Sequence, residues 1–352
     1  MSSWKASEHT YPWRIAVAVG IGALSLVLLY LLVYLSRVLL VIFAGVLMAI
    51  LLGGLAQQLS RRTALSRGPS LAIVTLLLVG GIVGFAVVAG PQISGQVAQL
   101  ADRLPAAVEQ IRDSRQYEWS QQVLDNIPNI QDIIPTPADV LGSITNVFSR
   151  TFGVLTNLFI IFIIGIYGAV NPDAYVESIV HMVPPDRRDR GREVLHALGR
   201  ALRWWLVGRF TMMLIVGVLT ATGLWIAGVP SAMALGLIAG VMAFVPYIGP
   251  ILSAIPAILV ALLVSTTKVI YVLIVYGIVE TLESYLLTPL VQERAVSILP
   301  AALISAQVIM GVLAGAVGVL LATPLAVSVI VLVQMLYVED VLGDDVKVLG
   351  EH

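Results

Sequence analysis

The sequence predicts an all-α, polytopic helical membrane protein, and two observations carry this prediction. The 352 residues are 59% apolar and only 12% charged, about half the charged share of an ordinary soluble domain. The charges are also segregated, and a bilayer is crossed by roughly 20 apolar residues. The charge-free runs are Ile15–Ser36, Val38–Ser60, Gly68–Ala101, Thr151–Pro172, Phe210–Thr267 and Ala295–Val338.

The N-terminal region, residues 1–90, is expected to hold three spans. They are Ile15–Ser36, Val38–Leu59 and a third from about Ser70 to Val88. Arg37 marks a predicted tight turn between the first two. The first run is too long for a cleavable signal core, so we expect a retained span. The loop Arg61–Arg67 has three arginines and no acid, which predicts a cytoplasmic loop and a cytoplasmic N-terminus.

Residues 91–150 differ in kind from a membrane span. Apolar side chains recur there every three or four positions, with charged residues off that stripe, as in an amphipathic helix. Acids outnumber arginines from Asp102 to Arg150, which favours an extracytoplasmic location. Such a stripe usually packs on neighbouring helices, and a lid over a pathway is the alternative.

The next region, residues 151–204, combines a fourth span with an arginine-rich segment. The span is Phe152–Val170, and Asn171–Arg209 then holds seven arginines and five acids. This segment predicts a cytoplasmic helical hairpin broken at Pro184-Pro185, whose arginines serve topology and contact with anionic lipid. Arg209 is the exception, because it borders the next apolar run. It either belongs to a transport site or extends its charge to the membrane interface.

The core of the chain, residues 205–338, begins with a fifth span, Phe210–Ala227. Two arms follow, Ser231–Val245 and Ile251–Ser265, each roughly 22 Å of helix against a hydrocarbon core of roughly 30 Å. Pro246–Pro250 joins them, and in lipid the backbone groups that prolines leave free need partners in protein or a wet cavity. A re-entrant hairpin over residues 231–265 is predicted, with two tilted spans as the alternative.

A second broken unit is predicted in the C-terminal hairpin, residues 296–338. Its arms, Ala301–Ala322 and Leu325–Val338, are expected to meet at Thr323-Pro324, with glycines at packing spacing in the first arm. One full span over residues 269–287 separates the two hairpins. The acidic tail, residues 339–352, is predicted to end in the cytoplasm.

Two carboxylates on that span are the main candidates for chemistry. Glu280 and Glu283 lie three positions apart, which places both on one helix face. A charge near the bilayer centre costs roughly 2.5–3.5 kcal/mol even on the lenient scale, so each should face the interior, meet a donor or hold a proton. Glu283 could serve a proton or cation site, or it could brace the N–H groups of the broken helix. The expected depth of Glu280 in the membrane favours a coupling role for it. The predicted transport and coupling residues are therefore Glu280, Glu283 and Arg209.

Several residues are candidates for shaping a pathway. They are Pro246, Tyr247, Gly249, Pro250, Tyr285, Pro289, Pro300 and Pro324. The prolines and the glycine would act through the backbone. The two tyrosines could line a path, although anchoring at the membrane interface is commoner.

Other function classes find little support in the sequence. The chain has no cysteine and a net charge of −1, which predicts no thiolate metal site, no cofactor and no nucleic-acid partner. We find no hydrolase, zinc-peptidase or nucleotide-binding motif, so the chain is not expected to be an enzyme. Secondary transport of a small polar solute is therefore predicted. A channel and a non-transporting scaffold are the alternatives.

Residues 184–336 resemble the autoinducer-2 exporter family of bacterial inner-membrane proteins, also called PerM-like permeases. The most specific features are the Pro-Tyr-Ile-Gly-Pro sequence at Pro246–Pro250, the Glu283-x5-Pro289 pair, and Pro300 eleven residues further on. Arg209 departs from the family pattern, in which glutamine is common there. Glu293 and Ser297 stand where glycines are frequent.

This resemblance implies a multi-pass transporter of the bacterial cytoplasmic membrane with about eight membrane segments. It implies export of the quorum-sensing signal autoinducer-2, coupled to protons or sodium, or alternatively sodium (lithium)/proton antiport. It also implies a homo-oligomer, for example a pentamer, surrounded by membrane lipid.

Overall fold

The computed structural model describes residues 10–84, 87, 156–262, 264–287 and 299–344. All regular elements among these residues are helices, which confirms the all-α fold class. By length and composition, five helices could cross a membrane, and a bent pair, Thr156–Val170 with Pro172–Val180, adds a sixth candidate. The five are Tyr34–Arg62, Arg67–Gly84, Pro185–Ile226, Thr266–Leu287 and Pro300–Leu342. The predicted amphipathic region, residues 91–150, lies outside the described residues.

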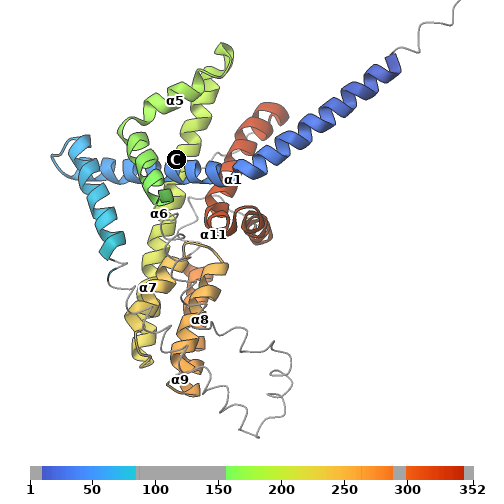
Figure 1. Cartoon of the computed structure of the whole chain (residues 1–352). Coiled ribbons are helices and arrows are strands. Elements are labelled where there is room, and N and C mark those ends of the chain that lie inside the picture. Colours follow the sequence, from blue (N-terminus) through green and yellow to red (C-terminus); the bar gives the residue numbers. More distant parts are fainter. Residues whose placement is uncertain (1–9, 85–86, 88–155, 263, 288–298, 345–352) are drawn as a thin grey trace, which may run out of the picture.

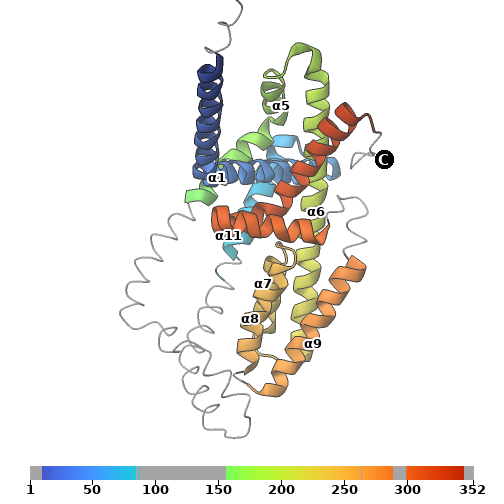
Figure 2. The same cartoon turned by 90° about the vertical axis from the view of Figure 1, so that its right-hand side faces the viewer.

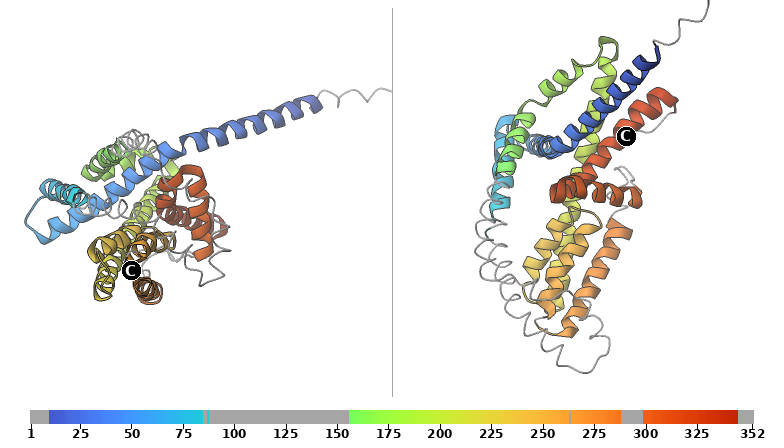
Figure 3. Two further views of the ribbon diagram at one scale, coloured as in Figure 1. Left: turned by 60° about the horizontal axis from the view of Figure 1, so that its bottom comes forward. Right: turned by 45° about the vertical axis from the view of Figure 1, so that its right-hand side comes forward.

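The first two predicted spans form one continuous helix, so the predicted turn at Arg37 is wrong. Helix α1 (Thr10–Arg62) has 53 residues, about 80 Å at 1.5 Å per residue. No glycine or proline stands between Gly22 and Gly45, and arginine is a good helix former, so nothing interrupts the backbone ladder. The N-terminal half extends away from the other helices (Figures 1 and 3).

A helix long and apolar enough for the third predicted span is present over Arg67–Gly84. Leu52 and Ala56 of α1 pack in one cluster with Leu71 and Val74 of this helix. Ala169, near the end of the fourth span, completes the cluster. The fourth span then bends by 88° into α5 (Pro172–Val180).

The predicted break at Pro184-Pro185 is confirmed. Pro184 is extended, with φ −50° and ψ 143°, and a short 3₁₀ turn, η2 (Pro185–Arg187), follows it. Helix α6 (Arg188–Ile226) then runs for 39 residues. It joins the arginine-rich segment and the fifth span into one rod, and α1, α5, α7, α9 and α11 all pack against it.

The two short arms are present as helices α7 (Ala232–Met242) and α8 (Ile248–Leu262). They run side by side in opposite directions below the middle of α6 (Figure 1). The turn that joins them occupies residues 243–247, and Gly249 and Pro250 belong to the first turn of α8. We call the turn at residues 243–247 the elbow.

Helices α6 and α7 touch through their backbones. A Cβ built on Gly240 would lie 2.7 Å from the Met213 carbonyl oxygen and 3.0 Å from Gly217 Cα. One on Gly236 would lie 2.6 Å from Ala221 Cα. Gly217 with Ala221, and Gly236 with Gly240, are pairs of small residues four apart, the spacing that lets membrane helices approach closely.

The acid-bearing span is helix α9 (Thr266–Leu282), which continues as a π-helical turn, η3 (Glu283–Leu287). Ser265 caps the start of α9 by accepting the Lys268 backbone N–H. Lys268 Nζ donates to the Ala227 carbonyl at the end of α6. This contact places the ends of α6 and α8 and the start of α9 together, as Figure 2 shows.

The C-terminal hairpin breaks at Gly315 and not at Thr323-Pro324. Helix α11 (Pro300–Val333) has φ 64° and ψ −146° at Gly315, a conformation that only glycine adopts at low cost. Pro324 is buried inside the second arm, which tolerates the missing N–H. The prediction was wrong because a proline removes only one helical hydrogen bond, which the second arm tolerates, whereas Gly315 leaves the helical conformation altogether.

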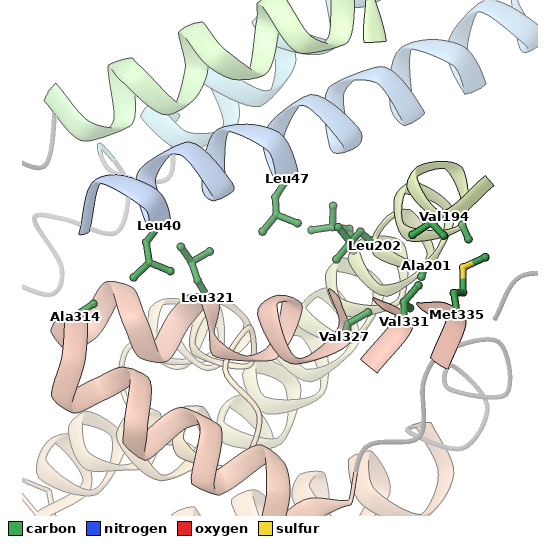
Figure 4. Packing of buried hydrophobic residues seen from close by; sticks show 12 residues of the cluster. Leu40, Leu47, Val194, Ala201, Leu202, Ala314, Leu321, Val327, Val331 and Met335 are labelled. Atoms are coloured by element: carbon green, nitrogen blue, oxygen red, sulfur yellow. The ribbon is translucent and has the colours of Figure 1, made fainter. Parts of the chain in front are cut away.

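A large apolar core joins α1, α6 and α11, and Figure 4 shows its side chains. Leu40 and Leu47 of α1 face Leu321 of α11, while Leu202 of α6 lies beside Val327. Val331 and Met335 extend the cluster toward the arginine-rich end of α6. Many large apolar side chains remain exposed outward, which fits a protein surrounded by lipid.

An arginine-bridged elbow as the candidate functional site

The amides of residues 243–245 donate to carbonyls in the last turn of α7, so the carbonyls of the elbow itself need other donors. Two amides from the chain just beyond the elbow satisfy part of this need. Ile248 N–H donates to the Pro246 carbonyl at 2.7 Å and Gly249 N–H to the Val245 carbonyl at 3.0 Å. Tyr247 takes φ 65°, an uncommon value for a non-glycine residue. The elbow is therefore a tight, strained turn that presents oxygens to its neighbours.

Arg209 of α6 reaches this turn with its guanidinium. Its Nε donates to the Phe244 carbonyl at 3.0 Å. Its Nη1 lies 3.6 Å from Glu283 Oε1, an ion pair in which both side chains are 10% exposed. One guanidinium thus joins α6, the elbow and the start of the π-helical turn.

Gln307 of α11 binds the other side of the elbow. Its Nε2 donates to the Pro246 carbonyl at 3.0 Å, and the residue has no exposed surface. The sequence prediction missed Gln307. A signal was present, because it is the only amide or charged side chain in residues 295–333, and a polar group in so apolar a run needs a partner.

Three polar atoms of this cluster remain without a hydrogen-bond partner among the described residues. They are Arg209 Nη2, Glu283 Oε2 and Gln307 Oε1, all inaccessible to solvent. Buried polar atoms are nearly always hydrogen-bonded in proteins. One donor and two acceptors on side chains that bind the same elbow form a polar centre that can interact with a further group.

Glu280 lies one helical turn before Glu283 and is half-buried. It makes no hydrogen bond or ion pair with the described part of the chain. The prediction that two acids share a face therefore brings only Glu283 into direct contact with the elbow. The bracing alternative also changes, because Glu283 pairs with Arg209, and Arg209 binds a carbonyl and not N–H groups.

The other residues that were candidates for shaping a pathway have different surroundings in the structure. Gly249 is required at the elbow, since a Cβ there would lie 1.9 Å from the Met242 carbonyl oxygen. Tyr285 is 79% exposed, away from the buried cluster, which fits the anchoring alternative. Pro300 begins α11, and Pro324 is buried in its second arm. Pro289 lies outside the described residues.

The opposite end of α6 carries a second cluster of charges. Arg190 forms ion pairs with Glu193, Glu339 and Asp340 and donates to the Met335 carbonyl. It thereby ties the terminal π-helical segment η4 (Gln334–Leu342) to α6. We call this set the Arg190 cluster.

A separate pair ties α5 to α6. Arg192 forms a two-point contact with Glu177, from Nε at 2.8 Å and Nη2 at 3.2 Å. The hydrogen bond from Arg192 holds the pKa of Glu177 below its usual value. No group of three or more metal-ligating side chains occurs in the described ranges.

Apolar spans around a charged pair buried against broken-helix carbonyls are the arrangement expected of a membrane transport protein. The sequence comparison identifies which one: the profile of the AI-2E family of transporters matches residues 21–337. The chain therefore belongs to the AI-2E transporter family, which is a family of permeases and not of enzymes.

Several curated relatives agree with this membership. The candidate transport protein MT0215 of Mycobacterium tuberculosis is 33% identical over 310 residues, 82% of this chain and 81% of its own length. Candidate transport proteins YueF and YrrI of Bacillus subtilis are 29% and 28% identical, over 72% and 74% of this chain and 73% and 76% of their own lengths.

Proposed function

We propose that the protein is a secondary transporter that exports a small polar solute and is coupled to protons or sodium. The observation that carries the proposal is the Arg209–Glu283 pair, which is buried against the Phe244 carbonyl. Burying two charges is costly, and a well-packed apolar contact of the same volume is often equally stable. An ionisable side chain buried within the membrane-spanning part of a protein usually marks a functional site.

The polar centre supports transport over a purely structural role. Arg209, Glu283 and Gln307 each have one buried polar atom without a partner in the described part of the chain, although a structural brace would be expected to satisfy all of them. Autoinducer-2 is the proposed solute, because of the likeness to its exporter family. Sodium (lithium)/proton antiport is the second candidate, because of the likeness to the same family.

The proposed location is the bacterial cytoplasmic membrane, with both termini in the cytoplasm. If the arginine-rich end of α6 is inside, then Ala227 and Lys268 at its far end are outside. Helices α7 and α8 would then enter and leave on the outside as a re-entrant hairpin. A homo-oligomer, for example a pentamer, is part of the proposal, and light scattering on detergent-solubilised protein tests it.

The natural absence of cysteine makes the topology directly testable. Met182 and Thr267 are exposed in the structure and lie near opposite ends of the α6 rod. In intact cells, an impermeant thiol reagent should label Thr267→Cys and spare Met182→Cys until the membrane is opened. Equal labelling of both in intact cells would contradict the re-entrant arrangement.

Counterflow in proteoliposomes tests the transport proposal itself. Vesicles preloaded with autoinducer-2 should take up labelled autoinducer-2 faster than empty ones, because a carrier exchanges solute and a channel does not. Glu283→Gln should lower this rate at least about tenfold, and Glu280→Gln should change its dependence on an imposed pH gradient. Glu193→Gln, on the exposed end of α6, is the matched control.

Other results of the counterflow experiment would support one of the alternative functions. Uptake without acceleration by preloading indicates a channel, and sodium movement against protons without organic solute indicates the antiporter. No flux with any solute or cation, in folded protein, leaves the scaffold alternative. If both glutamate variants match wild type in rate and pH dependence, the coupling assignment is wrong.

A further inference from the structure

The guanidinium of Arg209 occupies the position that a bound metal cation would take at a broken helix. It touches the Phe244 carbonyl at 3.0 Å and lies 3.6 Å from a carboxylate oxygen of Glu283. Proteins bind sodium with such oxygens, namely the carbonyls of an interrupted helix together with a carboxylate. Here the positive charge belongs to the chain itself.

Further oxygens at the elbow could complete a cation site. Glu283 Oε2 and Gln307 Oε1 are buried and have no partner among the described residues. Gln307 is bound to the Pro246 carbonyl, two residues from Phe244 along the same turn. The Phe244 carbonyl and the Glu283 carboxylate therefore meet at the guanidinium, and an amide oxygen without a partner is held on the same turn.

We propose that Arg209 is a tethered cation that fills this site, so that the elbow of the native protein binds no sodium. Removing its charge should open a sodium site formed by Glu283, Gln307 and the elbow carbonyls. The inference rests on the proposed function in one respect. If the protein is an ion-coupled transporter, a filled elbow excludes sodium as the ion that binds there. Binding at the elbow does not itself require transport.

Charge balance explains why the two cations should exclude each other. Glu283 is the only buried carboxylate among the described residues, and Arg209 already neutralises it. A sodium ion added beside Arg209 would leave one uncompensated positive charge in a buried site, which is strongly unfavourable. Glu280 is the nearest further acid, and it is half-buried and outside the contact.

The experiment measures sodium binding by thermal unfolding of the purified full-length protein in detergent. Sodium chloride replaces choline chloride at constant ionic strength, for wild type, Arg209→Gln, Arg209→Lys, Glu283→Gln and Arg209→Gln/Glu283→Gln. Wild type and Arg209→Lys should show no sodium-specific shift. Arg209→Gln should gain a rise of about 3 °C when sodium exceeds its Kd tenfold. The double variant should lose that rise.

Three results would overturn the proposal. One is a sodium-dependent rise in wild type that Glu283→Gln abolishes, because the native site would then bind the ion beside Arg209. Another is folded Arg209→Gln without any sodium response. If Arg209→Gln folds only when sodium is present, the proposal is supported. If it folds in neither salt, sodium does not replace the charge of the guanidinium, and the proposal is overturned.

This readout separates the inference from the proposed function. If counterflow fails but the variants respond to sodium as expected, transport is refuted and the tethered cation stands. If counterflow succeeds but wild type binds sodium at the elbow, transport stands and the tethered cation is refuted.

Discussion

Two arginines on the same helix have opposite surroundings. Arg190, near the start of α6, is 28% exposed and pairs with three acids. Arg209, nineteen positions further on, is 10% exposed and pairs with Glu283 alone. The first has spare partners and water nearby, whereas the second has one carboxylate and one carbonyl in an apolar surrounding.

The difference shows why position, more than residue type, decides what an arginine does in this fold. A partly exposed cluster with several acids tolerates the loss of any member, because water and the remaining charges replace it. A buried pair does not, since removing one partner leaves the other charge uncompensated. The predictions below start from this contrast.

The largest effect is expected from Arg209→Ala, which should destabilise the folded protein by about 3–5 kcal/mol. Arg190→Ala should cost about 1 kcal/mol or less. Thermal unfolding in one detergent compares them. Adding Glu283→Gln to Arg209→Ala should restore part of the loss, because no unpaired charge remains. Equal losses for the two single variants would remove the contrast.

The next largest effect tests the uncharged side of the elbow. Gln307→Leu removes one of two donors to the Pro246 carbonyl, which keeps the Ile248 N–H, and should cost about 0.5–1.5 kcal/mol, the net worth of one hydrogen bond. Ser305→Ala on the same arm, where the residue is exposed, is the control and should be nearly neutral. If Gln307→Leu unfolds like wild type, the elbow does not depend on α11.

A smaller effect should distinguish the two arginines by their response to salt. The Arg190 cluster is partly exposed, so salt should screen it, and the cost of Arg190→Gln should fall as ionic strength rises. The cost of Arg209→Gln, measured with choline chloride, should not fall. Unfolding midpoints at low and high salt measure both. A salt-sensitive Arg209 would mean that its site is open to water.

The smallest effect concerns pH and the exposed Glu177–Arg192 pair. Arg192 lowers the pKa of Glu177 in the folded protein, so the stabilisation is present above the ordinary carboxyl pKa. It is lost as the pH falls through the lower, folded value. Glu177→Gln should therefore remove a small part of the acid dependence of the unfolding midpoint. An unchanged acid dependence would show that the pair contributes nothing measurable.

Long apolar runs and proline clusters predicted most of the helices, because membrane thickness and missing N–H groups act locally. The same reasoning failed at two places. The charge of Arg37 suggests a turn, yet nothing in the local sequence breaks a helix there. Pro324 suggests the break in α11, but the residue that leaves the helical conformation is Gly315, with φ 64°.

The candidate site was predictable only as separate parts. Arg209, Glu283 and the elbow each stood out, since each is polar or broken within an apolar run. That Arg209 and Glu283 meet, 74 positions apart in the chain, depends on how α6 and α9 pack. Gln307 comes from a third region, and spacing along a helix cannot predict contacts between helices.

The glycine contacts around the elbow have a mechanical consequence. Main-chain atoms of α6 and α7 touch at Gly217 and Gly240, and those of α7 and α8 touch at Gly249. Backbones at that distance cannot slide or spread without overlapping, so these three helices form a stiff block. Helices α9 and α11 pack on α6 through side chains, whereas the elbow itself is held to them by Gln307 and, through the buried guanidinium, by Glu283. Side-chain packing can adjust more easily than backbone contact, so a small shift of α9 or α11 would change what surrounds the guanidinium while the block keeps it in place.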